Sequence, residues 1–178
     1  MIEVICGPMF SGKTEELIRR IRRLQYAEVD FMLFKPTIDD RYHEINITSH
    51  NKTTIKSIPI QYASEITLHL DQNPHITTIA IDEVQFLHPD IVGICNNLDP
   101  NYHILVAGLD MNHKGEPFAV MQGFLPIADT IEKLSAVCVK CGHDAKMSYK
   151  ISQDAIIVDV GGAEKYEARC RKCWASVC

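Results

Sequence analysis

Hydrophobic positions along the chain fall into short runs separated by amphipathic or polar stretches. Apolar and mostly β-branched residues open the chain and stop at Gly7, which predicts a strand followed by a turn. Between residues 13 and 26 the apolar positions 17, 18, 21 and 24 recur at helical spacing and share one face. Arginines at 19, 20, 22 and 23 occupy the other side, which we interpret as a solvated face rather than an anion site.

The spacing of apolar residues predicts alternating strands and helices further along the chain. We expect strands at residues 29–34, 77–81 and 102–107, helices at 64–70 and 89–98, and a polar functional loop at 37–54. Short apolar strands separated by helices favour parallel pairing, which is the α/β class. The pattern changes near residues 134–137, so we expect a P-loop α/β nucleotide-binding domain over residues 1–136 and a cysteine-bounded module over 137–178.

Composition narrows the classes of partner. A chain of 178 residues suits one main domain with a small appendage. Its net charge of −5 argues against a surface built to grip nucleic acid, so we expect no nucleic-acid partner. The chain shows neither an apolar run of the ~18 residues that a membrane span needs nor the pattern of a signal peptide. We therefore expect a cytoplasmic protein without a membrane partner.

The first turn carries a phosphate-binding motif. It fits G-x-x-x-x-G-K-[ST] at every fixed position and lies between a predicted strand and a predicted helix. Backbone N–H groups can close around phosphates, Lys13 can reach the β- and γ-phosphates, and Thr14 can offer its hydroxyl to Mg²⁺. The motif consists of Gly7, Pro8, Met9, Phe10, Ser11, Gly12, Lys13 and Thr14. We expect this loop to bind ATP together with Mg²⁺.

Acidic residues end a later strand, as in a Walker B element. Asp82 follows the apolar run 79–81 and is our candidate for the magnesium side. Glu83 is then left to accept a proton from a substrate hydroxyl. The polar loop adds Asp39, which could share the metal, and Arg41, which could offset charge on the transferred phosphate. Residues of this kind are also common on plain surface loops.

Two Cys-x-x-Cys pairs mark the C-terminal module. Four thiolates in two knuckles suit tetrahedral zinc in a closed structural site. The pairs are Cys138 with Cys141 and Cys170 with Cys173. Two disulfides or an iron–sulfur cluster are the alternatives, and His143 could compete as a ligand. We expect a structural Zn²⁺ that holds the segment between the pairs and takes no part in phosphoryl transfer.

Several motifs occur together and in order, and jointly they resemble the zinc-containing (type II) thymidine kinases. They are the phosphate loop, Phe34-Lys35-Pro36 with Asp39-x-Arg41-Tyr42, Ile81-Asp82-Glu83-Val84-Gln85-Phe86, Gly108-Leu109-Asp110, Pro117-Phe118 and Gly161-Gly162-Ala163-Glu164-Lys165-Tyr166. The resemblance implies a P-loop (RecA-like) parallel sheet with a small C-terminal zinc-binding module carrying a lasso loop. It implies transfer of the γ-phosphate of ATP to the 5′-hydroxyl of thymidine and deoxyuridine in nucleotide salvage.

The resemblance also implies roles for single residues. Glu83 matches the general base, Arg41 and Lys13 act at the phosphates, and Asp82, Asp39 and Gln85 lie on the ATP and magnesium side. The expected nucleoside contacts are Met9, Phe86, Leu109, His113, Phe118, Ser148, Ile157, Val158, Asp159, Val160, Gly161 and Tyr166. Without the resemblance, we would interpret Met9, Phe86 and Leu109 as core residues and Gly161-Gly162 as an ordinary tight turn. His113 and Ser148 stand where many family members have phenylalanine and threonine.

Feedback inhibition by dTTP and a homotetramer are implied by the resemblance alone. A competing hypothesis is a P-loop ATPase with a zinc ribbon that acts on nucleic acid. Its sequence support is the same phosphate loop and cysteine pairs, but a basic or aromatic strand-binding surface is not evident. An inactive relative is a weaker third reading, because every expected catalytic position is filled.

Overall fold

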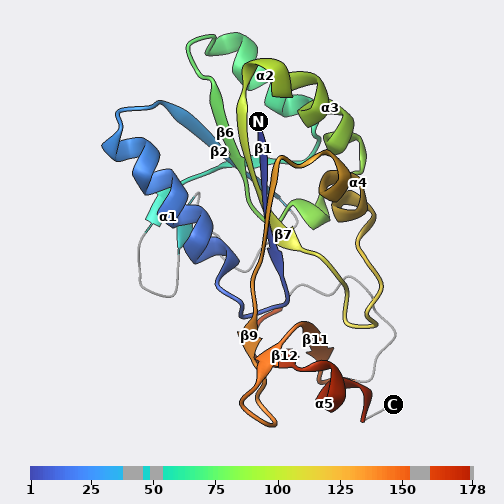
Figure 1. The fold of residues 1–178 in the computed structure, drawn as a ribbon. Coiled ribbons are helices and arrows are strands. Elements are labelled where there is room, and N and C mark those ends of the chain that lie inside the picture. The colour runs from blue at the N-terminus through green and yellow to red at the C-terminus, as the bar shows by residue number, and fades with distance from the viewer. Residues whose placement is uncertain (38–45, 49–53, 153–160, 177–178) are drawn as a thin grey trace.

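The computed structural model describes residues 1–37, 46–48, 54–152 and 161–176. Its centre is a six-stranded sheet in which every neighbouring pair is parallel (Figure 1). Across the sheet the order is β5 (Ile58–Ile60), β2 (Phe31–Pro36), β6 (Thr78–Ile81), β7 (His103–Leu109), β1 (Ile2–Gly7) and β8 (Thr130–Lys133). The expected α/β class with a parallel sheet is confirmed.

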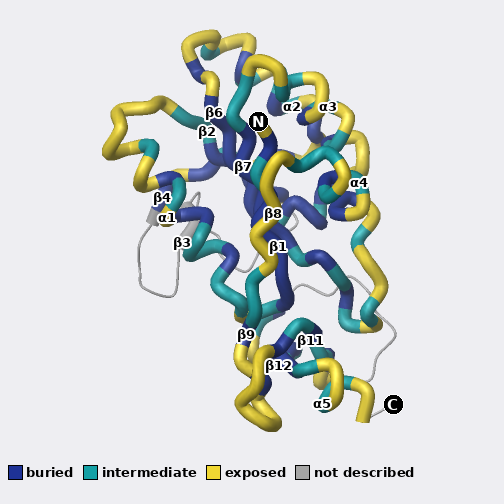
Figure 2. The backbone as a smooth tube through the Cα atoms, viewed as in Figure 1, coloured by how far each residue is buried: buried dark blue, intermediate teal, exposed yellow. Residues whose placement is uncertain are grey.

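Helices cover both faces of this sheet. One face packs against α1 (Lys13–Tyr26), and the other against α2 (Ser64–Gln72), α3 (Asp90–Leu98) and α4 (Ala119–Ile127) (Figure 1). Alternate residues of β1 divide between the two cores: Ile5 packs with Leu17 of α1, whereas Val4 belongs to the cluster that contains Phe124 of α4. The central strands are therefore buried on both sides, as Figure 2 shows in dark blue.

Most of the predicted elements are confirmed, but the sequence patterns missed several others, including β5 and, inside the polar loop predicted at 37–54, the short strand β3 (Asn46–Thr48). The helix predicted at residues 13–26 is α1. The strand predicted at 29–34 lies two residues later as β2, because the chain stays extended through Pro36, which pairs with Ile60 of β5. The sequence patterns did not predict α4, which contains Pro126, or β8, an edge strand whose residues are all exposed.

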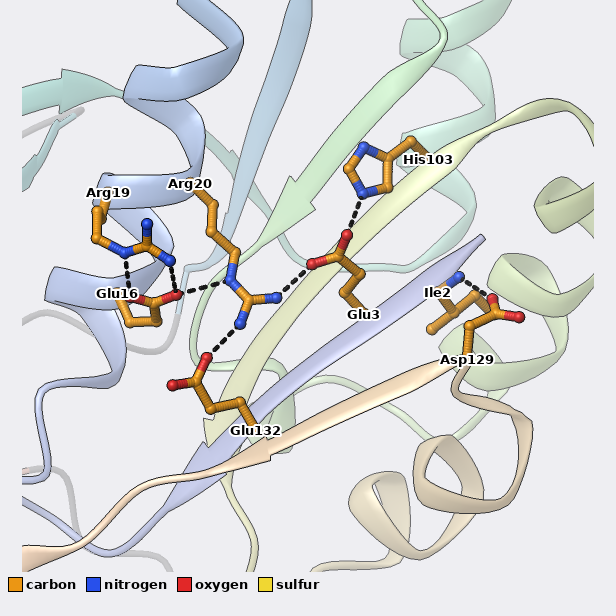
Figure 3. A network of polar contacts seen from close by, with 8 residues as sticks. All are labelled: Ile2, Glu3, Glu16, Arg19, Arg20, His103, Asp129 and Glu132. Atoms are coloured by element: carbon orange, nitrogen blue, oxygen red, sulfur yellow. Dashed lines mark hydrogen bonds and ion pairs between the residues drawn. The ribbon is translucent and has the colours of Figure 1, made fainter.

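A network of ion pairs connects α1 to the sheet (Figure 3). The guanidinium of Arg20 donates to carboxylates on three elements: Glu16 of α1 at 2.8 Å, Glu3 of β1 and Glu132 of β8. Arg19 also donates to Glu16, from Nε to Oε2 at 2.5 Å. Acids thus partly neutralise the basic face of α1. Exposed Arg19 agrees with the interpretation of this face as solvated, whereas Arg20 is half-buried among carboxylates.

The C-terminal part lies beyond the carboxyl ends of the central strands (Figure 1). It contains β9 (Ala136–Val137) paired with β10 (Asp144–Ala145), β11 (Met147–Lys150) paired with β12 (Tyr166–Arg169), and α5 (Arg171–Ala175). Short segments elsewhere are the antiparallel pair β3 (Asn46–Thr48) and β4 (Thr54–Lys56), and the 3₁₀ turns η1 (Val84–Phe86) and η2 (Asp99–Asn101). Within the described ranges, no helix has both the length and the apolar character needed to cross a bilayer.

Candidate active site

The phosphate-binding motif connects the end of β1 to the start of α1. Gly12 precedes the first helical residue with φ 82°, in the left-handed region that a side chain would strain. Its carbonyl accepts the first helical hydrogen bond, from Glu16 N–H at 2.9 Å. The expected order of strand, turn and helix is present, so the amino terminus of α1 directly follows the loop.

Lys13 is held inside the loop that it belongs to. Its ammonium donates to the carbonyl of Pro8 at 2.8 Å, and the same carbonyl accepts from the Ser11 hydroxyl at 2.8 Å. The side chain is buried although it is charged, which requires partners such as this carbonyl. The amine thus lies against the phosphate-binding backbone, where an anion can bind it.

Asp82 and Thr14 meet at the end of β6. The Thr14 hydroxyl donates to Oδ2 of Asp82 at 3.2 Å, although the two residues come from different elements. Burial, followed by the negative charge of Glu83, raises the pKa of Asp82 to about 7. A cation beside this carboxylate would favour its ionised form. A hydroxyl and a carboxylate are oxygen ligands of the kind that Mg²⁺ prefers, so these two residues fit that ion.

Glu83 follows Asp82 in a left-handed backbone conformation, with φ 50°. Such a conformation is uncommon for a residue with a side chain and is found at functional sites more often than elsewhere. Its N–H donates to Oδ1 of Asp82 at 3.0 Å, and its carboxylate accepts from the Gln85 amide at 2.5 Å. Two adjacent acids are thereby separated: Asp82 is buried beside Thr14, and Glu83 is partly exposed.

The C-terminal module contacts the phosphate loop directly. Ser148, on β11, accepts a hydrogen bond from the backbone N–H of Met9 at 3.0 Å. Lys146 donates to the carbonyls of Lys133 and Leu134 at 3.2 Å each, and Leu134 N–H donates to Cys6 at 2.8 Å. The predicted nucleoside contact Ser148 is therefore placed next to Met9, another predicted nucleoside contact.

A tight loop follows β7 and is also held by the module. Asn112 organises it through its side-chain oxygen, which accepts from the N–H groups of Lys114 and Glu116 at 2.9 and 3.1 Å. The indole of Trp174 donates to the His113 carbonyl at 3.1 Å. The sequence predictions included neither Asn112 nor Trp174. Trp174 could have been recognised from the sequence, because it is the single tryptophan of the chain and directly follows the predicted zinc ligand Cys173.

The other predicted nucleoside contacts in the described residues are half-buried or buried. Phe86, Leu109 and Phe118 are half-buried, and Phe118 packs against the core cluster on the α4 side. Gly161 and Tyr166 are buried, with Tyr166 at the start of β12. The predicted contacts Asp39, Arg41, Ile157, Val158, Asp159 and Val160 lie outside the described residues.

The four predicted zinc ligands converge. The sulfurs of Cys138, Cys141, Cys170 and Cys173 all lie within 4.8 Å of one another, and this cluster includes no histidine. Zn–S bonds of about 2.3 Å in a tetrahedron place sulfurs about 3.8 Å apart, close to the 3.7 Å between Cys141 and Cys170. That separation far exceeds the ~2.05 Å of a disulfide. The side chain of His143 instead faces the Cys141 carbonyl at 3.2 Å.

The thiols influence one another strongly. Burial opposes ionisation of Cys138, but the backbone N–H groups of Cys170, Lys140 and Cys141 outweigh it and lower the pKa of Cys138 to about 6. Hydrogen bonding with the sulfurs of Cys141 and Cys170 raises the pKa of Cys173 to about 12. Because the sulfurs cannot all ionise together without a cation, the cluster fits a divalent metal such as zinc.

With this geometry in place, the comparison with known families is decisive. The family model described as thymidine kinase matches residues 1–174. The chain belongs to the thymidine kinase family. It is accordingly an ATP-dependent kinase with thymidine as its acceptor, which confirms the resemblance drawn from the motifs. The alternative of an ATPase acting on nucleic acid is not supported. Roles of individual residues and the division into domains at residue 136 stay predictions.

Proposed function

We propose that this kinase transfers the γ-phosphoryl group of ATP to the 5′-hydroxyl of thymidine or deoxyuridine, with Glu83 as the general base, in nucleotide salvage. The observation that carries the proposal is the separation of two neighbouring acids. Asp82 is buried against Thr14 of the phosphate loop, while the left-handed backbone at Glu83 leads the second carboxylate away to Gln85. One acid then serves the phosphate side and the other the acceptor.

The chemical step needs little beyond positioning and charge. The Glu83 carboxylate takes the proton of the acceptor hydroxyl as the new oxygen–phosphorus bond forms. The bond between the γ-phosphorus and its bridging oxygen breaks, and its electron pair leaves with ADP. Lys13 stabilises the charge on the transferred group from its place against Pro8. By resemblance, Arg41 adds a second positive charge.

Thr14 and Asp82 would hold Mg²⁺, with Asp39 assigned to the same ion by resemblance. Their support is the pair of oxygen donors 3.2 Å apart and the buried carboxylate, whose charge requires an opposite charge. An Mg²⁺ held there with ATP would supply positive charge to offset the negative charge of the β- and γ-phosphates.

The acceptor specificity is proposed to come from a pocket walled by Met9, Phe86, Leu109 and Phe118 and closed by the segment that reaches Gly161 and Tyr166. Support comes from the hydrogen bonds that draw Met9 and the loop after β7 to the C-terminal module. Such a pocket accepts a pyrimidine and excludes a purine by size. Phosphorylation of deoxyadenosine as efficient as that of thymidine would contradict this assignment.

Glu83→Gln tests the base assignment. The variant should bind ATP normally while its turnover of thymidine falls by roughly 10²–10⁴-fold. Glu28→Gln is a matched control, because Glu28 is exposed and also has a left-handed backbone, with φ 54°. Turnover within about threefold of the unaltered enzyme in Glu83→Gln would remove Glu83 from this role.

Assembly, regulation and compartment are proposed from family membership alone. We propose a cytoplasmic homotetramer inhibited by dTTP. Light scattering measures the mass of the assembly, and inhibition by dTTP that competes with thymidine tests the regulation. A monomer in solution, or full activity at saturating dTTP, would contradict the respective part.

A further inference from the structure

Gln85 makes two hydrogen bonds that together fix the orientation of its amide. Its Oε1 accepts from the backbone N–H of Leu109 at 3.0 Å, and its Nε2 donates to Oε2 of Glu83 at 2.5 Å. An amide has one acceptor end and one donor end. Because the N–H of Leu109 can only donate, the oxygen must face Leu109, and the NH₂ group is left for the carboxylate.

The surroundings of this amide keep it in place. Gln85 is buried, and it lies on the short turn η1, two residues after Glu83. At Gly108 an added Cβ would lie 2.6 Å from Oε1 of Gln85, so a side chain at this point of β7 would displace the amide from its observed position. Leu109 itself pairs in register with Gly7, the first residue of the phosphate loop. The amide therefore connects Glu83 to a rigid part of the sheet beside the phosphate site.

We propose that Gln85 is a positioning residue for phosphoryl transfer, which fixes the Glu83 carboxylate relative to the sheet edge where the phosphate loop begins. The proposal rests on the proposed function, in which Glu83 is the base. In this proposal Gln85 orients Glu83 toward the acceptor hydroxyl and needs no contact with ATP or Mg²⁺. A carboxylate that could rotate freely would spend less time within reach of the acceptor hydroxyl.

If Gln85 acts by positioning Glu83, its loss should lower kcat and leave substrate binding almost unchanged. Gln85→Met preserves length and apolar volume but removes both hydrogen bonds. We expect kcat to fall about 10- to 100-fold, because a misplacement of about 1 Å costs on that order. The KM for thymidine and the Kd for ATP should stay within about twofold. Gln122→Met on the exposed side of α4 is the matched control.

A double-mutant cycle separates positioning from a general structural role. Glu83→Ala removes the carboxylate, so that nothing remains for Gln85 to position. In that background, Gln85→Met should change the residual kcat by less than about twofold. If it lowers the residual kcat by the same factor as in the unaltered enzyme, Gln85 acts elsewhere and the proposal is wrong. If Glu83→Ala alone retains near-normal turnover, the base assignment fails instead.

A second variant covers the case in which Gln85→Met does not fold. Gln85→Glu retains an acceptor for the Leu109 N–H but replaces the donor with a carboxylate that repels Glu83. We expect a loss of kcat at least as large as in Gln85→Met, and again almost none on the Glu83→Ala background. A Gln85→Glu enzyme with unaltered kcat would overturn the proposal, because the donor would then be dispensable.

Discussion

The hydroxyl of Ser148 and the backbone N–H of Met9 are joined by a hydrogen bond of 3.0 Å across 139 positions of sequence. One partner belongs to the phosphate loop and the other to β11 in the C-terminal module. The module therefore does more than supply a segment near the nucleoside. It supports the backbone of the loop that we propose to bind ATP, so a change in the module should alter binding at both proposed substrate sites.

Removing the Ser148 hydroxyl should weaken ATP binding. In Ser148→Ala the Met9 N–H loses its acceptor in a partly buried place, which costs about 1 kcal/mol and allows the loop to relax. We expect the Kd for ATP, measured by calorimetry, to rise roughly three- to tenfold. The matched variant Ser148→Thr retains the hydroxyl and should bind ATP as the unaltered enzyme does. Equal affinities for the alanine and serine enzymes would show that the contact is neutral.

The phosphate loop could be predicted from sequence because its chemistry and its fold are both local. Gly7 to Thr14 are contiguous, and the turn is dictated by residues next to one another in the chain. The four cysteines were likewise recognisable, since each pair has metal-ligand spacing. In both cases a few neighbouring residues carry the whole signal.

Elements that depend on distant partners could not be predicted in this way. Gly123 in α4 suggests a break, yet an added Cβ there would meet Val92 of α3 at 2.8 Å, so this glycine serves helix packing. Exposed β8 has no apolar pattern and is held by pairing with β1. The link of Gln85 to Leu109 spans 24 positions and appears only when β6 and β7 lie side by side.

Zinc should be required for the stability of the C-terminal module. The hydrophobic cluster around the cysteines is very small, with Ala136, Ala145 and Ala168 as its other members, and cannot offset the entropy of ordering this part of the chain. We expect about one zinc per chain by metal analysis, and a melting temperature lowered by roughly 10 °C or more in Cys138→Ser. Cys95→Ala is the control: it creates a core cavity yet should retain the zinc. Full zinc content in Cys138→Ser would contradict the ligand assignment.

Arg20 should stabilise the enzyme far more than its neighbour Arg19. Arg20 connects α1 to β1 and β8, whereas among the described residues the ion pair of Arg19 is local, with Glu16, and its side chain is largely exposed (Figure 3). Arg20→Ala should lower the free energy of unfolding by about 1–3 kcal/mol, because acids from three elements lose a shared donor. Arg19→Ala should lower it less, because the ion pair of Arg19 with Glu16 is largely exposed to solvent. Denaturant titration of both variants measures the difference, and equal losses would show that the network contributes no tertiary stability.

The same network predicts a specific loss of stability in acid. Hydrogen bonding with Arg19, followed by that with Arg20, lowers the pKa of Glu16 from 4.5 to about 2. The folded-state pKa lies below the unfolded value, so this stabilisation is complete above about pH 4.5 and is lost as pH falls toward 2. The loss should amount to about 1–3 kcal/mol after allowance for solvent screening. In Glu16→Gln the unfolding free energy should fall less steeply over this window. If the unfolding free energy of Glu16→Gln depends on pH as steeply as that of the unaltered enzyme, Glu16 is not a source of the acid sensitivity.

Trp174 should affect thymidine more than ATP, because it supports the loop after β7 rather than the phosphate loop. Its indole N–H donates to the His113 carbonyl, and its ring lies where a Cβ on Gly115 would be 3.4 Å away. Trp174→Phe retains an aromatic ring but cannot donate, so the loop that carries His113 loses one anchor. We expect the KM for thymidine to rise about three- to tenfold, with the Kd for ATP within about twofold. Trp174→Phe should therefore impair nucleoside binding with little effect on ATP, whereas Ser148→Ala should impair ATP binding as well, because Ser148 holds Met9 of the phosphate loop. If both variants impaired both substrates equally, the module would act as a single rigid support rather than through two separate contacts.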